Sequence, residues 1–166
     1  MKYIFILVIL FTLASCNNQV NSTEKEKSSG LWAPTGDKYT LGPDEDVEIV
    51  KNMIKSFNKL DANGLSKLIA DTIYFYPYNS QGVIKLPNSA IESFTSQYDS
   101  VETNSIHFLP YSNAGQGKRI VQTIQNENLY FKGGKNDSLH ILNLWFINDE
   151  NKIYSIRQFN AEWANN

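Results

Sequence analysis

The sequence predicts an α+β domain in which helices come first along the chain and strands follow. Residues 43–101 carry apolar side chains at helical spacing in three places, and the residues from 105 onward form long segments rich in β-branched and aromatic side chains. Clusters of Gly, Asn and Asp separate these later segments, as turns separate antiparallel strands. This order favours three helices packed on one face of a curved, mainly antiparallel sheet.

The N-terminus has the pattern of a secretion signal. Lys2 provides a positive charge, and an apolar run from Tyr3 to Leu13 follows it. This run is far shorter than the ~20 residues that a membrane-spanning helix needs, so we interpret it as a targeting segment. Leu13-Ala14-Ser15-Cys16 resembles a lipobox, in which the cysteine is acylated and becomes the first mature residue. The alternatives are an ordinary cleaved signal and a short N-terminal anchor.

A polar segment follows Cys16, which is the only cysteine of the chain. Residues 17–30 are rich in Ser, Asn, Lys and Glu and contain too little apolar surface to become ordered, and residues 31–42 are expected to be an irregular lead-in. Asn17 carries no acidic signal for inner-membrane retention, so we expect a bacterial outer-membrane lipoprotein that faces the periplasm. The predicted divisions are a signal peptide (1–15), the lipidated Cys16 with a flexible tether (16–42) and one domain (43–166).

Three helices are expected at the start of the domain. Pro43 and three acidic residues precede the first helix, where proline and negative charge are favourable. The first helix is expected to end at Asp61-Ala62-Asn63-Gly64, and a short second helix follows. The third is expected to begin at Asn88 or Ser89 with a capping box. The apolar stripes of the three helices are Val47, Val50, Ile54 and Phe57; Leu65, Leu68 and Ile69; and Ile91, Phe94, Tyr98 and Val101.

Strands are expected between the second and third helices and throughout the later part of the domain. The first strand should end near Pro77, because proline cannot donate a hydrogen bond to a sheet. The expected strands are 73–78, 105–111, 119–132, 138–148 and 152–160.

Three stretches carry a resemblance to the nuclear transport factor 2-like superfamily, which includes ketosteroid isomerases and the SnoaL-like polyketide cyclases. Residues 57–62 resemble the end of its first helix, and residues 68–71 with the strand to Pro77 resemble its next segment. Asn88-Ser89-Ala90-Ile91 resembles the start of its third helix, and residues 151–160 resemble its closing strand. The resemblance implies a cone-shaped domain with a pocket between the helices and the sheet.

The chain departs from the isomerase branch at the positions that carry its chemistry. Tyr76 stands where that branch has an Asp that acts as general base, and a phenol with a pKa near 10 is a poor base at neutral pH. Asn160 stands where the family commonly has a closing Asp, and Glu127 does not align with the second acid of that branch. We therefore assign no catalytic residue, and the sequence leans toward a protein that is not an enzyme.

Other kinds of site are disfavoured as well. His107 and His140 lack the spacing of metal ligands, and the glycines near residue 116 precede a strand, unlike a phosphate-binding loop. We expect no metal and no cofactor. The net charge of −2 and a pI of about 5.7 provide no basic surface for nucleic acid.

Aromatic and neutral polar residues are the remaining candidates for a binding site. Alternation places Asn143 and Trp145 on one face of an apolar strand. A buried amide needs a partner, so Asn143 either meets a ligand or bonds to Gln122 or Gln158. Arg157 is either a pocket charge or a partner of Glu162, and the aromatic residues either line a pocket or form the core. The candidate ligand-binding residues are Tyr74, Tyr76, Tyr98, Gln122, Asn143, Trp145 and Arg157.

Three functions stay open at this point. The first is non-catalytic binding of a small apolar ligand by a membrane-anchored domain, and the second is protein interaction. The third is an isomerase, cyclase or hydrolase with an atypical site. The strand at residues 138–148 favours protein interaction. Leu142, Leu144 and Phe146 lie on one face of this strand, and they make it as apolar as the opposite face. Such a row favours a partner surface, and we expect a homodimer.

Overall fold

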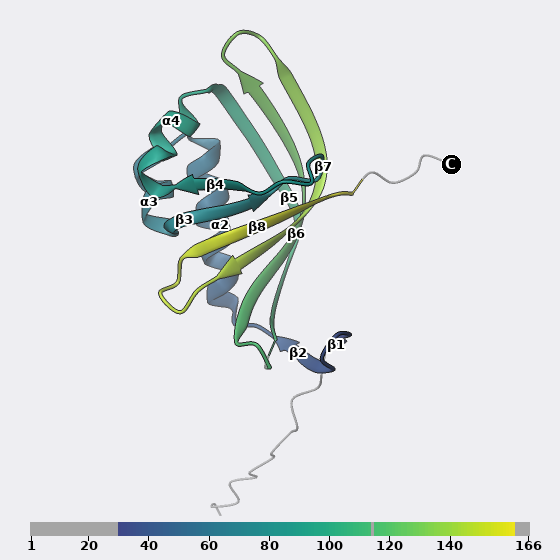
Figure 1. Cartoon of the computed structure of the whole chain (residues 1–166). Helices are drawn as coiled ribbons and strands as arrows, with labels where there is room; N and C mark the ends of the chain where they lie inside the picture. The colour runs from purple at the N-terminus through teal and green to yellow at the C-terminus, as the bar shows by residue number, and fades with distance from the viewer. Residues whose placement is uncertain (1–29, 114, 162–166) are drawn as a thin grey trace, which may run out of the picture.

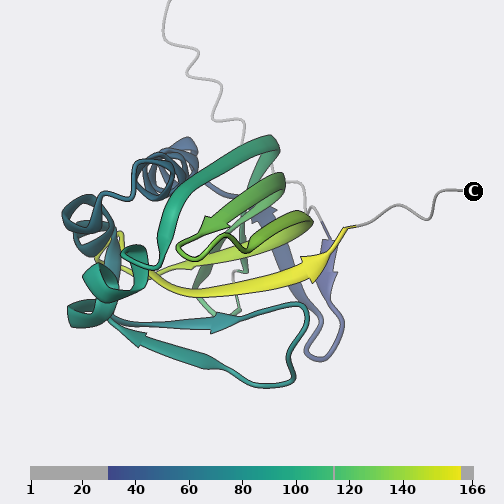
Figure 2. The ribbon, with the colours of Figure 1, turned by 90° about the horizontal axis from the view of Figure 1, so that it is seen from above.

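A computed structural model describes residues 30–113 and 115–161 as an α+β fold, in which three helices pack on one face of an eight-stranded curved sheet (Figure 1). The helices are α2 (Asp44–Asn58), α3 (Ala62–Leu68) and α4 (Ile91–Thr95), and a 3-10 turn, η1 (Asn88–Ala90), precedes α4. Seen from above, the helices gather on one side of the sheet (Figure 2). The predicted fold class is confirmed. The signal peptide, Cys16 and most of the tether lie outside the described residues.

The sheet has the order β1-β2-β5-β6-β7-β8-β3-β4, and only the pairing of β3 with β8 is parallel. Three strands, β5, β6 and β7, are long and form the centre, where the sheet bends around the helices (Figure 1). The strands are β1 (Gly30–Trp32), β2 (Asp37–Leu41), β3 (Ile69–Tyr76), β4 (Ile84–Pro87), β5 (Tyr98–Asn113), β6 (Lys118–Phe131), β7 (Asn136–Ile147) and β8 (Ile153–Asn160).

Three predictions about local structure were wrong. The lead-in at 31–42 is not irregular, because it supplies most of β1 and all of β2, and β2 pairs with the end of β5. The third helix ends at Thr95 and not near Val101. The hydroxyls of Thr95 and Ser96 bond back to carbonyl oxygens of the same helix, and Tyr98 already pairs with Phe131 as the first residue of β5. The expected capping box does not form, since the cap of α4 has no side-chain hydrogen bond.

The main core lies between the helices and the concave face of the sheet. Helix α2 buries Val50 and Ile54, which lie four residues apart and so share one face. The helix ends in a Schellman motif, in which Leu60 N bonds to Phe57 O and Asp61 N bonds to Ser56 O. The buried members of this core are Val50, Ile54, Leu65, Ile69, Ile73, Ile91, Val121, Trp145, Ile147 and Ile153.

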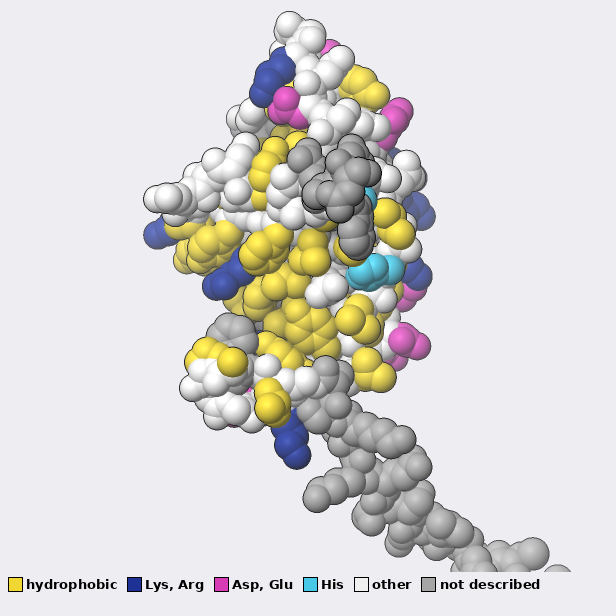
Figure 3. Space-filling view, turned by 90° about the vertical axis from the view of Figure 1, so that its right-hand side faces the viewer, with side chains coloured by type: hydrophobic (Ala, Val, Ile, Leu, Met, Phe, Trp, Pro, Cys, Tyr) yellow, Lys and Arg dark blue, Asp and Glu magenta, His cyan; other side chains and the backbone are white. Residues whose placement is uncertain are grey.

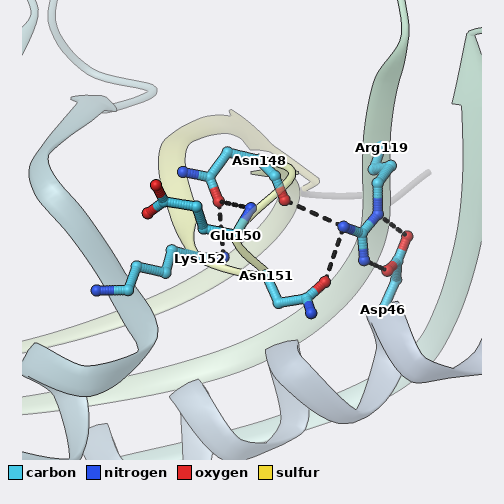
Figure 4. Close-up of polar contacts among 6 residues, drawn as sticks. All are labelled: Asp46, Arg119, Asn148, Glu150, Asn151 and Lys152. Carbon is cyan, nitrogen blue, oxygen red and sulfur yellow. Dashed lines mark hydrogen bonds and ion pairs between the residues drawn. The ribbon is translucent and has the colours of Figure 1, made fainter.

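One ion pair joins the start of α2 to the sheet (Figure 4). Asp46 is fully buried, and both of its carboxylate oxygens accept hydrogen bonds from the guanidinium of Arg119 on β6. Arg119 Nη1 also donates to Asn148 O at 3.0 Å and to Asn151 Oδ1 at 2.9 Å, in the turn between β7 and β8. The first helix, a central strand and the last hairpin therefore meet at one side chain.

Candidate functional site

A row of buried polar side chains crosses the concave face of the sheet. Strand β6 contributes Thr123, Gln125 and Glu127, whose exposed fractions are 0%, 1% and 9%. The neighbouring strands add Thr103 from β5 and Asn143 from β7, and both are buried. Polar groups cost free energy when they leave water. A concentrated row of them inside the fold is therefore the first candidate for a functional site.

Hydrogen bonds run along this row in one direction. Trp145 Nε1 donates to Thr123 Oγ1 at 3.0 Å, and Thr123 Oγ1 donates to Gln125 Oε1 at 3.0 Å. Gln125 Nε2 then donates to Glu127 Oε2 at 3.2 Å. The hydroxyl of Thr103 lies 3.4 Å from the same oxygen. The carboxyl group of Glu127 is thus the acceptor at which the chain of donors ends.

Burial decides the protonation of this carboxyl group. Burial raises the pKa of Glu127 above its ordinary value, and the hydrogen bonds from Thr103 and Gln125 oppose that shift less strongly. The phenol of Tyr98 is affected as well, since burial, the charge of Glu127 and the charge of Asp137 raise the pKa of Tyr98 to about 12. This end of the row therefore favours neutral groups.

Two polar atoms beside the row have no hydrogen-bond partner among the described residues. They are Asn143 Oδ1 and Ser105 Oγ, and both atoms are buried. Asn143 lies opposite Gln158 in the register of β7 and β8, but the two amides are not bonded, and Gln122 lies on the other face of the sheet. The internal amide pairing considered for Asn143 is therefore not made. An unpaired buried acceptor costs about 1–3 kcal/mol, which a bound molecule could offset.

A hollow opens onto one end of the row. It lies between α2 and β5, has a volume of about 330 Å³, and Thr103 and Ser105 from the concave face are among its lining residues. Lys51, Lys55 and Lys59 line its helical side at intervals of one turn. Ile54 and Phe108 add apolar surface to its lining. The mouth of the hollow is therefore basic, while its interior combines neutral polar and apolar groups.

The sequence-predicted binding residues fall into separate places. Asn143 and Trp145 belong to the concave row, and Tyr98 packs with Phe57, Phe94 and Phe131 in an aromatic cluster. The other four lie on the convex face, because residues that pair in register share one face of the sheet. Arg157 pairs with both Tyr76 and Leu144, and Leu144 also pairs with Gln122. These four are Tyr74, Tyr76, Gln122 and Arg157.

Sequence reasoning missed Thr123, Gln125 and Glu127. Their alternate spacing was a usable signal, because period-two positions of one strand share a face. The same row continues to Val121 and Leu129, which are apolar and buried. Polar residues that interrupt the apolar face of a strand indicate a polar site inside the fold. Asn143 interrupts the apolar face of β7 in the same way.

Neither histidine belongs to the row. His140 Nδ1 lies 2.6 Å from Asn126 Oδ1, and the register of β5, β6 and β7 places His107 and His140 on the convex face. Within residues 30–113 and 115–161, no group of three His, Cys, Asp or Glu side chains is placed to hold a metal ion. The same part of the chain contains no helix long and apolar enough to cross a membrane.

Solved structures with the same architecture identify the fold. A Mycobacterium tuberculosis protein in complex with estradiol-17beta-hemisuccinate matches with a TM-score of 0.54 and 14% identity, over 69% of this chain and 92% of that one. An LEH-like epoxide hydrolase of the same organism matches with a TM-score of 0.53 and 12% identity, over 70% and 82%. This chain has the nuclear transport factor 2-like fold.

A third structure of this fold is the epoxide hydrolase/cyclase-like enzyme SalBIII, which takes part in pyran ring formation in the polyether salinomycin. It matches with a TM-score of 0.56 and 15% identity, over 71% of this chain and 92% of that one. No protein-family model matches the sequence, and no curated protein matches it either. Function must therefore be argued from the side chains that this chain places on the fold.

Proposed function

We propose that this domain binds a small, mostly apolar molecule between its helices and the concave face of its sheet, without catalysing a reaction. The unpartnered Asn143 Oδ1 carries the proposal, because it is a buried acceptor in a row whose other members are bonded to one another. A ligand that donates one hydrogen bond to this oxygen would remove its desolvation cost. The hollow of about 330 Å³ at the Thr103 end of the row is within the usual size of ligand pockets, although Asn143 is not one of its lining residues.

Two observations favour binding over catalysis. Tyr76, at the general-base position of the isomerase branch, lies on the convex face, away from the row. Glu127 Oε2 already accepts from Thr103 and Gln125, so this oxygen is engaged by other members of the row. Structures of this fold include a steroid-conjugate complex and a co-crystal with polyporic acid. They support a ligand with a rigid apolar body.

Thermal shift tests this proposal, with estradiol as the probe, because it lacks the carboxylate of the hemisuccinate. Asn143→Leu should raise the melting temperature of the free protein, because it removes an unpaired buried amide, and it should reduce the shift that the probe causes. Gln122→Leu makes the same amide-to-leucine change on the convex face and should leave the probe's shift unchanged. An equal shift in wild type and Asn143→Leu would contradict the proposed site. A measured turnover that Glu127→Gln abolishes would refute the non-catalytic role.

We further propose that the domain is held at the outer membrane by acyl chains on Cys16, facing the periplasm. The support is the lipobox-like Leu13-Ala14-Ser15-Cys16 and the short apolar run before it. Cys16→Ala should leave the precursor without acyl chains and move the protein into the soluble fraction, because attachment by acyl chains needs that thiol. Recovery of the variant in membranes after washing with salt and carbonate would rule out the lipid anchor.

A second candidate function is assembly through the convex face. An antiparallel sheet with one solvent-facing side should show polar residues there, but Leu109 and Phe159 are 42% and 49% exposed on this face. Leu142 and Leu144 lie half-buried between them. Hydrophobic side chains form a broad patch on this side of the molecule (Figure 3). A homodimer that covers this patch accounts for its composition.

A further inference from the structure

A second hollow, with a volume of about 360 Å³, lies on the convex face where β3 meets β8. Four aromatic residues line it, from β3, β7 and β8, together with two basic residues. None of its lining residues is acidic. The aromatic residues are Tyr74, Tyr76, Phe146 and Tyr154, and the basic residues are Lys118 and Arg157.

The guanidinium of Arg157 is the distinctive group of this hollow. Its central carbon lies 5.0 Å from the ring centroid of Tyr76 and 5.5 Å from that of Phe146, so two cation–π contacts hold it. The hydrogen bonds and ion pairs of the described residues give Arg157 no acceptor. Its N–H donors form a planar fork that matches a carboxylate. The side chain is therefore positioned by aromatic contacts and keeps its hydrogen-bonding capacity.

We propose that this convex hollow is a second binding site, which takes a small aromatic carboxylate. The carboxylate pairs with the N–H fork of Arg157, and the flat apolar body lies against the aromatic walls. Charge-assisted, bidentate pairs of this kind are among the stronger hydrogen bonds in proteins. Lys118 adds a second positive charge. Tyr154 supplies a neutral hydroxyl, because burial raises the pKa of its phenol more than Arg157 lowers it.

Binding of 2-naphthoate to the full-length protein tests the proposal, with 2-naphthylmethanol as the neutral analogue of the same shape. The acid should bind at millimolar concentration or below and shift the NMR signals of Tyr76 and Arg157. Arg157→Gln should weaken its binding roughly tenfold or more, because the charge-assisted pair is lost. The alcohol should bind more weakly than the acid by a similar factor. Binding is measured at a protein concentration where sedimentation shows only the monomer, because a second copy on the convex face would cover the hollow.

The matched control is Lys55→Gln, which removes a positive charge from the mouth of the concave hollow. It should leave the affinity for 2-naphthoate within about twofold of wild type, a difference well below 1 kcal/mol. The proposal is overturned if the alcohol binds as tightly as the acid, or if the acid does not bind. It is also overturned if Lys55→Gln weakens binding while Arg157→Gln does not. The last result would place the acid in the concave hollow and leave the first proposed function standing.

Discussion

Glu127 shows at the scale of one residue how the fold sets the chemistry of the concave row. Its carboxyl group is reached by donors from Thr103 and Gln125, yet burial is the stronger influence and raises its pKa. A protonated carboxyl can donate one hydrogen bond as well as accept several. Glu127 can therefore offer a ligand a donor at pH values where its carboxyl group is protonated, while Asn143 Oδ1 offers an acceptor.

Glu127→Gln should change the dependence of stability on pH. Below pH 4.5, the ordinary pKa of the group, both folded and unfolded chains are protonated and the two proteins should be similarly stable. Above it, the unfolded chain releases the proton and the folded chain retains it. The wild type then loses stability relative to the variant by about 1.4 kcal/mol per pH unit, until the folded-state pKa is reached.

Urea unfolding from about pH 4 to about pH 8 would measure this difference. Glu102→Gln, which makes the same substitution at an exposed residue of β5, is the control. A pH-independent difference for Glu127→Gln would mean that water reaches the carboxyl group.

Sequence reasoning at this scale was limited by what one strand can show. The alternation of side chains along β7 predicted that Asn143 and Trp145 lie on the same face, and both are buried on the concave face. Tyr74, Tyr76 and Arg157 were grouped with them only because they are aromatic or charged. Which face of β3 and β8 they occupy depends on the register of a parallel pair between distant segments, including a bulge between Ile69 and Tyr74. No local pattern contains that register.

At the scale of elements, the strong helix and the strands β6, β7 and β8 were predictable, whereas the first part of β5 and the weak elements were not. Helix α2 has a long apolar stripe, whereas α4 consists of only five residues. The spacing of Ile91, Phe94, Tyr98 and Val101 fits a helix. Tertiary pairing of Tyr98 and Val101 with β6 overrides that local preference. The hairpin of β1 and β2 is stabilised by β5, which comes much later in the chain.

Helix α3 depends on its cap, because it has only seven residues. Asp61 Oδ1 accepts from Gly64 N at 2.9 Å at the N-terminus of this helix. Asp61→Ala should lower the free energy of unfolding by about 1 kcal/mol, whereas Asp61→Asn, which keeps an acceptor, should lower it by less. Chemical denaturation of the three proteins measures both effects. Equal losses in the two variants would show that the negative charge matters more than the cap.

At the scale of the whole molecule, the convex face predicts association of two chains. Sedimentation of the full-length protein at micromolar concentration should show a dimer. Leu144→Glu should shift it to monomer, because a charge would be buried at the interface without a partner. Val83→Glu makes the same kind of change in the loop between β3 and β4 and should leave the dimer intact. A monomeric wild type whose Leu144→Glu variant is equally soluble and stable would contradict the proposed dimer, because it would show that Leu144 is not buried against a partner.

The contacts of Arg119 bear on the order in which the chain can fold. Asp46 lies in the first described helix, while the turn that contains Asn148 and Asn151 precedes the last strand. Until that turn has formed, Arg119 lacks two of its acceptors, and the docking of α2 onto the sheet is incomplete. Contacts so distant in sequence require large loops to close, which makes folding slow. A chain that enters its folding compartment with the N-terminus first therefore cannot complete the contacts of Arg119 until nearly all of the domain has arrived.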